Sequence, residues 1–292
     1  MSLYRKSNIN NVLVTGGAGF IGGSLIRKLL KESDVNIFNL DKCGYASDLT
    51  GINNLIKEKD INLARYQFLK VNLSDLKATN KAVFKSDPDL VFHFAAESHV
   101  DRSITGPRVF IESNVIGTYN LLESLKSHWN LLPEKRKKVF KLIHISTDEV
   151  FGSLGEKGFF SEKSSYDPRS PYSASKAASD HLVNSFHHTF GVPSVITNCS
   201  NNYGPWQFPE KFIPLSIINS LSNKDFQIYG DGKNIRDWIF VEDHIDALQL
   251  VALNGKIGDS YCIGGEQQKT NDEIADLLCS KLDELNKLNR PH

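Results

Sequence analysis

The chain has 292 residues, and its 34 Lys and Arg balance its 34 Asp and Glu, so it carries no formal net charge. This balance gives no reason to expect nucleic acid or an anionic membrane as a partner, and no apolar run reaches the roughly 18 residues that a membrane helix needs. A polar amino terminus without a secretory signal predicts a cytoplasmic protein, and the length allows one large domain or two smaller ones.

The first predicted unit is a strand, a glycine loop and a helix. An apolar strand at 11–14 is followed at once by Thr15–Gly22, and apolar residues then recur at helical spacing. Gly16, Gly19 and Gly22 allow the backbone to approach a pyrophosphate, which then lies on the N–H groups at the start of the helix. The loop therefore predicts a dinucleotide cofactor.

A second strand at 35–40 ends in Asp41, nineteen residues after Gly22. A carboxylate at this place binds the adenosine ribose and repels a 2′-phosphate, which favours NAD over NADP. Two alternatives remain: Asp41 is only a turn residue, or the adjacent Lys42 admits NADP.

Further strands at 66–71 and 90–94, with an amphipathic helix at 76–84 between them, continue the alternation of strand and helix. This order predicts an α/β fold with a doubly wound parallel sheet of the NAD-binding Rossmann type, over residues 1–200. After the strand at 90–94, the small Ala95 and Ala96 leave room for a cofactor, and Ser98 is placed to face a substrate.

Glycine and proline at 106–107 lead into a long helix that we expect to continue through Trp129. This helix and a later one that carries Ala174, Ala177 and Ala178 offer close-packing surfaces, which would suit a homodimer. Alternatively, the alanines face the core of their own chain, and the pattern favours neither arrangement.

Candidate catalytic residues follow the strand predicted at 141–145. Thr147, Asp148 and Glu149 lie at its carboxyl end, where open α/β sheets bind ligands. Tyr172 and Lys176 follow a Ser-Pro helix start at i, i+4 spacing and so share one helix face. A cation about 4 Å from a phenol can lower the phenol pKa by up to roughly 3 units, which predicts a base. The alternative is that the triplet only caps a turn and that the tyrosine is packed.

Beyond a strand at 192–197, turn residues, aromatics and prolines replace the alternating pattern, and an apolar helix opens at Lys211. Residues 201–292 therefore predict a smaller substrate-binding part, with the chain rejoining the first domain at about 236–255. We expect a strand and a turn at 227–232. Arg236 suits a bidentate clamp for a diphosphate, or else a structural ion pair with Asp237 or Asp243.

The four cysteines are far apart and show no C-x-x-C spacing, so reduced thiols are expected rather than disulfides or a zinc site. His187 and His188 are adjacent on a polar helix, which is a poor arrangement for one metal ion. No metal site is predicted.

The chain resembles the extended short-chain dehydrogenase/reductases and, within them, the dTDP-glucose 4,6-dehydratases. Most of the chain takes part in this resemblance, through the segments Thr15–Gly22, Ala95–Ser103, Thr147–Glu149, Tyr172–Lys176, Cys199–Lys211 and Tyr229–His244. The Asp-Glu pair separates the dehydratases from epimerases and decarboxylases of the same fold. A non-catalytic NAD sensor, the rival of another class, would not need the full catalytic set.

The resemblance implies a reaction on dTDP-glucose. Tyr172, supported by Lys176 and Thr147, would remove the 4-hydroxyl proton while NAD takes the C4 hydride. Glu149 would remove the C5 proton, Asp148 would protonate the departing C6 hydroxyl, and the hydride would return to C6. UDP- and CDP-glucose carry the same reacting sugar and remain alternatives.

The resemblance also implies two sets of ligand-binding residues. The cofactor set is Gly16, Gly19, Phe20, Ile21, Gly22, Asp41, Lys42, Asn72, Leu73, Phe94, Ala95, Ala96, Ser113, Ser146, Tyr172, Lys176, Cys199 and Asn202. The substrate set is Ser98, Thr147, Asn201, Lys211, Tyr229, Arg236 and Asn271. The family continues past the position of His292 with a segment that bears arginine and tyrosine, so we expect a chain truncated at its carboxyl terminus.

Overall fold

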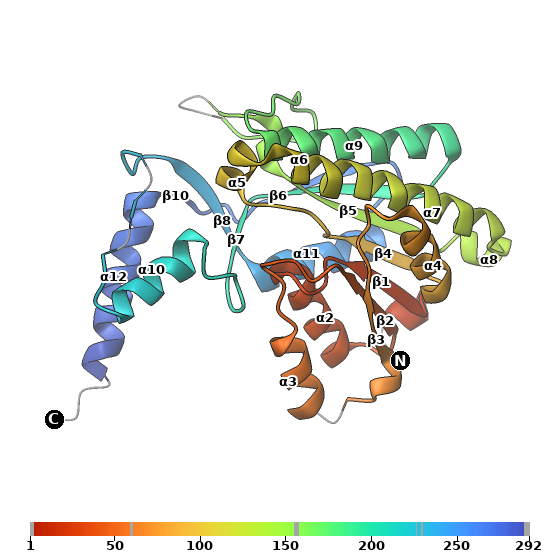
Figure 1. Cartoon of the computed structure of the whole chain (residues 1–292), viewed down its shortest axis with the longest axis horizontal. Helices are drawn as coiled ribbons and strands as arrows, with labels where there is room; N and C mark the ends of the chain where they lie inside the picture. The colour runs from red at the N-terminus through yellow and green to blue at the C-terminus, as the bar shows by residue number, and fades with distance from the viewer. Residues whose placement is uncertain (1–2, 59–60, 155–157, 226, 229, 289–292) are drawn as a thin grey trace. The chain divides into compact units, whose positions relative to one another are not determined.

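The computed structural model describes residues 3–58, 61–154, 158–225, 227–228 and 230–288 (Figure 1). The chain divides into two compact units. The first comprises Met1–Cys199 and Ile245–Ile263, and the second comprises Ser200–His244 and Gly264–His292.

A seven-stranded sheet organises the first unit. Its strands, in sheet order, are β3 (Tyr66–Lys70), β2 (Asn36–Asp41), β1 (Asn11–Thr15), β4 (Leu90–His93), β5 (Lys141–Thr147), β6 (Ser194–Cys199) and β9 (Ser260–Ile263). Every neighbouring pair is parallel. The central strands are buried almost throughout, as expected of a parallel sheet covered on both faces. The predicted doubly wound α/β fold is confirmed.

Helices cover both faces of this sheet (Figure 1). One face carries α2 (Phe20–Glu32), α3 (Thr50–Glu58) and α11 (Val241–Asn254), of which residues 245–254 belong to this unit. The other carries α4 (Leu76–Ser86), α7 (Gly117–Leu131) and α9 (Pro171–Phe190). Leucines of α7, Val83 of α4 and Phe186 of α9 pack in one buried cluster with strand residues such as Leu13 and Leu142. Shorter elements of this unit are α1 (Leu3–Lys6), η1 (Leu63–Arg65), α5 (Val100–Thr105), α8 (Glu134–Lys137) and η3 (Asp148–Phe151).

The long helix expected from Pro107 to Trp129 is not a uniform α-helix. It consists of α6 (Pro107–Phe110), a π-helical segment η2 (Ile111–Ile116) and α7. Asn114 in the π segment is buried, and its side chain exchanges two hydrogen bonds with the backbone of Glu97. A π segment changes which side chains face inward, and such segments often occur at functional sites. The predicted long helix is confirmed, since helical residues run without a break from Pro107 to Leu131, but helical spacing alone does not reveal the π segment within it.

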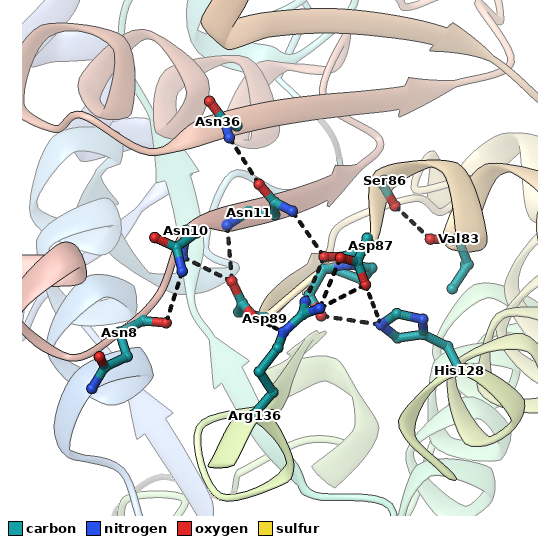
Figure 2. Close-up of polar contacts among 11 residues, drawn as sticks. Asn8, Asn10, Asn11, Asn36, Val83, Ser86, Asp87, Asp89, His128 and Arg136 are labelled. Carbon is teal, nitrogen blue, oxygen red and sulfur yellow. Dashed lines mark hydrogen bonds and ion pairs between the residues drawn. The ribbon is translucent and has the colours of Figure 1, made fainter. Parts of the chain in front are cut away.

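The polar cluster in Figure 2 ties together the amino-terminal ends of β1 and β4. Asp89 is 1% exposed; its Oδ2 accepts hydrogen bonds from the backbone N–H groups of Asn10 and Asn11, and its Oδ1 accepts one of 2.7 Å from Arg136 Nε. Arg136 also donates to the Asp87 carboxylate. Since the strands are parallel, this Asp89–Arg136 clamp lies at the end of the sheet opposite to their carboxyl ends.

The second unit contains a small sheet of the order β10 (Gln268–Thr270), β8 (Ile235–Phe240) and β7 (Asn201–Tyr203). β8 runs parallel to β7 and antiparallel to β10. Its two helices are α10 (Phe212–Leu221) and α12 (Asn271–Leu288), which contact each other.

The expected turn near 230 is confirmed, since Gly230 and Gly232 both have positive φ. The expected strand before it is wrong for Gln227 and Ile228, which have no regular structure and no strand partner. Tyr229 lies outside the described residues.

Candidate active site

The glycine loop packs backbone against backbone at the carboxyl end of β1. Gly16 has φ +72°, and a Cβ there would lie 2.6 Å from the backbone nitrogen of Ala95. A Cβ on Gly22 would lie 2.5 Å from the Gly16 carbonyl oxygen. Gly19, the N-cap of α2, has no side chain, and within the described residues its helix start has no side-chain cap. This arrangement fits a pyrophosphate. Phe20 and Ile21 lie in that first turn.

Asp41 connects the end of β2 to this loop. Its Oδ2 accepts a 3.1 Å hydrogen bond from the Ala18 N–H, and its Oδ1 accepts bonds from the Cys43 N–H and the Ser47 hydroxyl. The carboxylate is therefore held in place beside the glycine loop. Its predicted contact with the adenosine ribose stays a prediction.

Lys42 forms an ion pair with Glu97 at the carboxyl ends of the strands. Its Nζ lies 2.6 Å from Glu97 Oε1 and 3.0 Å from Ser113 Oγ. Lys42 follows β2 and Glu97 follows β4, and β1 lies between these strands, so the ion pair passes over the strand end that carries the glycine loop. Because the Lys42 ammonium already contacts Glu97 and Ser113, it is less available to the 2′-phosphate of NADP, which supports the preference for NAD. Sequence reasoning missed Glu97 because no motif or spacing marks a partner 55 residues away.

Thr147, Asp148 and Glu149 lie where they were expected. β5 ends at Thr147, and the short 3₁₀ helix η3 begins at Asp148. The Thr147 hydroxyl accepts a 3.3 Å hydrogen bond from the Glu149 N–H, so the capping role considered as an alternative is also present. Thr147 is buried, whereas Asp148 and Glu149 are half-buried.

The start of α9 brings a phenol and an ammonium to this strand end. Ser170 and Ser173 form a capping box, with Pro171 at the first position, so the helix starts at a defined residue. Tyr172 and Lys176 follow one turn apart and are 9% and 4% exposed. Lys176 Nζ donates a 2.8 Å hydrogen bond to the carbonyl oxygen of Ile145 in β5.

Electrostatics shows that these groups are neighbours. Burial raises the pKa of the Tyr172 phenol well above its usual value, and the negative charges of Glu149, Cys199 and Asp148 raise it further. A hydrogen bond with Thr147 lowers the same pKa. Of the catalytic set predicted from the sequence, Thr147, Asp148 and Glu149 thus lie around the phenol of Tyr172, and Lys176 follows one helical turn later.

The expectation that Lys176 brings the Tyr172 pKa towards neutrality is wrong for this structure, in which that pKa is raised. Transfer of a phenol from water into a buried site disfavours its anion, and here that cost is the largest effect. Burial likewise lowers the pKa of Lys176, with Asp180 and Cys199 acting in the opposite direction.

The other residues of the predicted cofactor set are placed as follows. Ser146 donates from Oγ to Asp180, and Cys199 donates from Sγ to the Ser146 carbonyl oxygen. Leu73 is part of the buried core, Asn72 is exposed and accepts a hydrogen bond from the Ser74 N–H, and Phe94, Ala95 and Ala96 follow β4. The exposed Ser98, from the substrate set, follows them.

Several predicted ligand-binding residues belong to the second unit. Asn201 and Asn202 lie in β7, and the Asn202 side-chain oxygen accepts a 2.7 Å hydrogen bond from His244 Nδ1. Lys211 is the N-cap of α10, and Asn271 begins α12. Tyr229 is outside the described residues.

Arg236 is exposed in β8. Among the residues that the structure describes, it makes no ion pair with Asp237 or Asp243. The Asp237 carboxylate instead accepts hydrogen bonds from the Gly265 and Gln267 N–H groups. The alternative role of Arg236, a structural ion pair with Asp237 or Asp243, is therefore not present among the described residues.

Within the described ranges, no group of three or more His, Cys, Asp or Glu is arranged to hold a metal ion. The same part of the chain contains no helix with the length and apolarity needed to cross a membrane.

Comparisons with known proteins agree with each other. The family model described as GDP-mannose 4,6 dehydratase matches residues 13–290. A probable dTDP-glucose 4,6-dehydratase of Sinorhizobium fredii is 49% identical over 274 residues, which cover 94% of this chain and 77% of that protein. The crystal structure of dTDP-glucose 4,6-dehydratase from Bacillus anthracis in complex with NAD has a TM-score of 0.82 at 38% identity, with 94% of this chain and 81% of that one covered. The enzyme of the same name from Streptomyces venezuelae, with NAD bound, has a TM-score of 0.83 at 40% identity, with 93% and 81% covered. The similarity therefore extends over both units.

Proposed function

We infer the function of this chain from one premise, that it belongs to the nucleotide-sugar 4,6-dehydratase family, with dTDP-glucose 4,6-dehydratases among its relatives. It is an NAD-dependent hydro-lyase that converts dTDP-glucose to dTDP-4-keto-6-deoxyglucose. The observation that carries this conclusion is the grouping of Thr147, Asp148 and Glu149 around the phenol of Tyr172 at the end of β5. An epimerase of the same fold has no use for that acidic pair.

The first unit supplies the cofactor-binding residues. Gly16, Gly19 and Gly22 leave space at the start of α2 for the pyrophosphate, and Asp41 is held beside them for the adenosine ribose. When bound, NAD would supply the acceptor for the C4 hydride and the donor that returns it to C6, while C5 is reprotonated. For the second unit we propose that Asn201, Lys211, Arg236 and Asn271 bind the nucleotide sugar, as the family resemblance implies.

The catalytic side chains move protons. Tyr172 Oη takes the proton of the 4-hydroxyl, with Thr147 hydrogen-bonded to the phenol and Lys176 one helical turn away. The Glu149 carboxylate removes the C5 proton, which the neighbouring 4-keto group has made acidic. Asp148 gives a proton to the C6 hydroxyl, which leaves as water.

Incubation with dTDP-glucose in deuterated water tests this function directly. The 4-keto product, followed by its absorbance in alkali, should form and should carry solvent deuterium at C5. Glu149→Gln should stop deuterium incorporation while leaving NAD bound. Formation of a C4 epimer without deuterium at C5 would instead assign the chain to the epimerases. UDP-, CDP- and GDP-glucose in the same assay test which nucleobase the enzyme prefers, and dTDP-glucose is expected to react fastest.

We also propose that the protein is a homodimer of the cytoplasm. Large apolar side chains are exposed on α6, η2 and α7, namely Val109, Ile111, Ile116 and Tyr119, and a second copy would cover them. No disulfide joins the four cysteines, all of which lie within the described residues, and this suits a reducing compartment. Sedimentation equilibrium of the wild type and of Ile116→Asp tests the dimer, because a charge in that surface should yield monomers. Fractionation of cells tests the compartment.

A further inference from the structure

A buried carboxylate, Asp180, lies on α9 one helical turn beyond Lys176. Its side chain is 0% exposed. Oδ2 accepts hydrogen bonds of 2.7 Å from Ser146 Oγ and 2.9 Å from the Tyr166 hydroxyl, and Oδ1 accepts one of 3.0 Å from His144 Nε2. These donors come from β5 and from the segment before α9. Asp180 therefore joins three parts of the chain behind the proposed catalytic residues.

The two histidines near this carboxylate are neutral. Thr118 donates its only hydroxyl proton to the Asn114 carbonyl oxygen, so His93 Nε2 must donate to Thr118, and His93 Nδ1 accepts from Thr15. His144 donates from Nε2 to Asp180, while its buried Nδ1 has no partner among the described residues, so a second proton there would be unsatisfied. Burial lowers the pKa of both imidazoles.

Lys176 is consequently the cation that needs a counter-charge. Its ammonium is buried, with one hydrogen bond to the Ile145 carbonyl oxygen. The titratable groups that interact with it are His93 on β4, His144 on β5, Cys199 on β6 and Asp180 on its own helix, and Tyr172 lies one turn before it. Of the groups that favour the charged ammonium, Asp180 has the largest effect and Cys199 the smaller one. A buried charge without a partner is costly, so the loss of Asp180 would favour the neutral amine.

We propose that Asp180 is a positioning residue of the reaction: it is the buried counter-charge that keeps Lys176 protonated one helical turn from Tyr172, and its hydrogen bonds with His144 and Ser146 hold α9 against β5. The proposal rests on the proposed function, in which Lys176 assists Tyr172. It gives a role to a carboxylate that none of the proton transfers uses.

Asp180→Asn tests the charge with little change of shape. The variant should reduce kcat about tenfold or more at neutral pH. Deprotonation of Lys176 should also occur at lower pH, so the alkaline fall in kcat should move down by at least about one pH unit. Tyr166→Phe is the matched control, since it removes one hydrogen bond from Asp180 and leaves the charge. It should keep the pH at which the alkaline fall occurs. An unshifted profile in Asp180→Asn would overturn the proposal, whatever the change in kcat.

Thermal unfolding provides a test that needs no activity. The proteins compared are the wild type, Lys176→Met, Asp180→Asn and the double variant Lys176→Met/Asp180→Asn. Removal of either charge leaves the other buried alone, so each single variant should unfold at a lower temperature, and the double variant should recover part of the loss. If Asp180→Asn alone fails to fold, a double variant that does fold would show the same coupling. Strictly additive losses would overturn the charge pairing. An inactive wild type that shows the coupling would refute the proposed dehydratase function and leave the proposed charge coupling of Asp180 and Lys176 standing.

Discussion

At the scale of single residues, the central question is how a buried phenol can act as a base. Tyr172 lies one turn from an ammonium, which favours the phenolate, but it is also buried near two carboxylates, which disfavour it. Coulomb attraction falls with distance and with the local dielectric, whereas desolvation acts on every buried charge. In this structure burial has the larger effect, so the resting Tyr172 holds its proton at neutral pH.

The first prediction concerns the pH dependence that follows. Because the Tyr172 pKa is raised, the ionised fraction of the phenol at neutral pH is small. As long as the pH stays below that pKa, this fraction should increase about tenfold for each unit by which the pH rises. We therefore expect kcat/KM for dTDP-glucose to rise with pH from 7 to 9. Tyr172→Phe should lower kcat by at least about 10²-fold and abolish the rise. A flat profile in the wild type would show that Tyr172 ionisation does not limit the reaction.

The second prediction concerns Gly16. An alanine there would need a left-handed backbone, and its Cβ would lie 2.6 Å from backbone that belongs to the segment after β4. The backbone conformation alone costs about 1–2 kcal/mol, and displacement of the loop removes the site for the pyrophosphate. Gly16→Ala should therefore lose NAD binding in a calorimetric titration. Gly44→Ala is the control, because a Cβ at Gly44 would meet only the flexible side chain of Lys42.

At the scale of elements, parallel strands separate two tasks between the ends of the sheet. The carboxyl ends of β1, β2, β4 and β5 carry the glycine loop, Asp41, Glu97 and the catalytic triplet. The amino ends of β1 and β4 carry the Asp89–Arg136 clamp (Figure 2). A change in the clamp should therefore affect stability far more than chemistry.

The third prediction tests that separation. Arg136→Met leaves the buried Asp89 carboxylate without its cation, which should lower the free energy of unfolding by about 2–4 kcal/mol. Urea denaturation should detect this loss, while kcat of the folded variant stays within about twofold of the wild type. In contrast, Arg108→Met removes an exposed pair with Glu112 and should cost less than about 1 kcal/mol. Equal losses in the two variants would mean that the clamp is not a stabilising feature.

At the scale of the whole molecule, buried histidines should make the fold sensitive to acid. Burial lowers the pKa of His93, His128 and His144 in the first unit and of His244, to about 3, in the second. When the folded pKa lies below the unfolded value of about 6.5, the unfolded chain binds protons first as the pH falls. Their stabilisation is thus complete above about pH 6.5 and is lost below it, for His244 down to about pH 3.

The fourth prediction gives the size of this effect. Each histidine that stays neutral in the fold should cost about 1.4 kcal/mol of unfolding free energy per pH unit below 6.5. Urea midpoints measured from pH 7.5 to 5 should therefore fall steeply below pH 6.5. His244→Gln should reduce the slope, whereas substitution of the exposed His188 should not. A midpoint independent of pH in this range would contradict the prediction.

Local interactions explain which features the sequence by itself determined. Strand and helix order, the glycines between β1 and α2, the Ser170 cap and the one-turn spacing of Tyr172 and Lys176 depend on residues close in the chain. Hydrophobic periodicity, helix-capping residues and the backbone preferences of single residues predict those features. The resemblance to the dehydratases added the roles of residues that these local rules do not distinguish.

Only the tertiary structure decided the rest. The pairing of Lys42 with Glu97, the turn of Asn114 into the core and the hydrogen bond from Ser146 to Asp180 join residues that are 17 to 55 positions apart. Burial of Tyr172, which reversed the expected direction of its pKa shift, likewise depends on segments that pack around it from other parts of the chain. The strand expected at Gln227 and Ile228 was wrong for the same reason, since a strand exists only where a partner is present to pair with it. Desolvation and long-range pairing are properties of the packed chain, and no local pattern contains them.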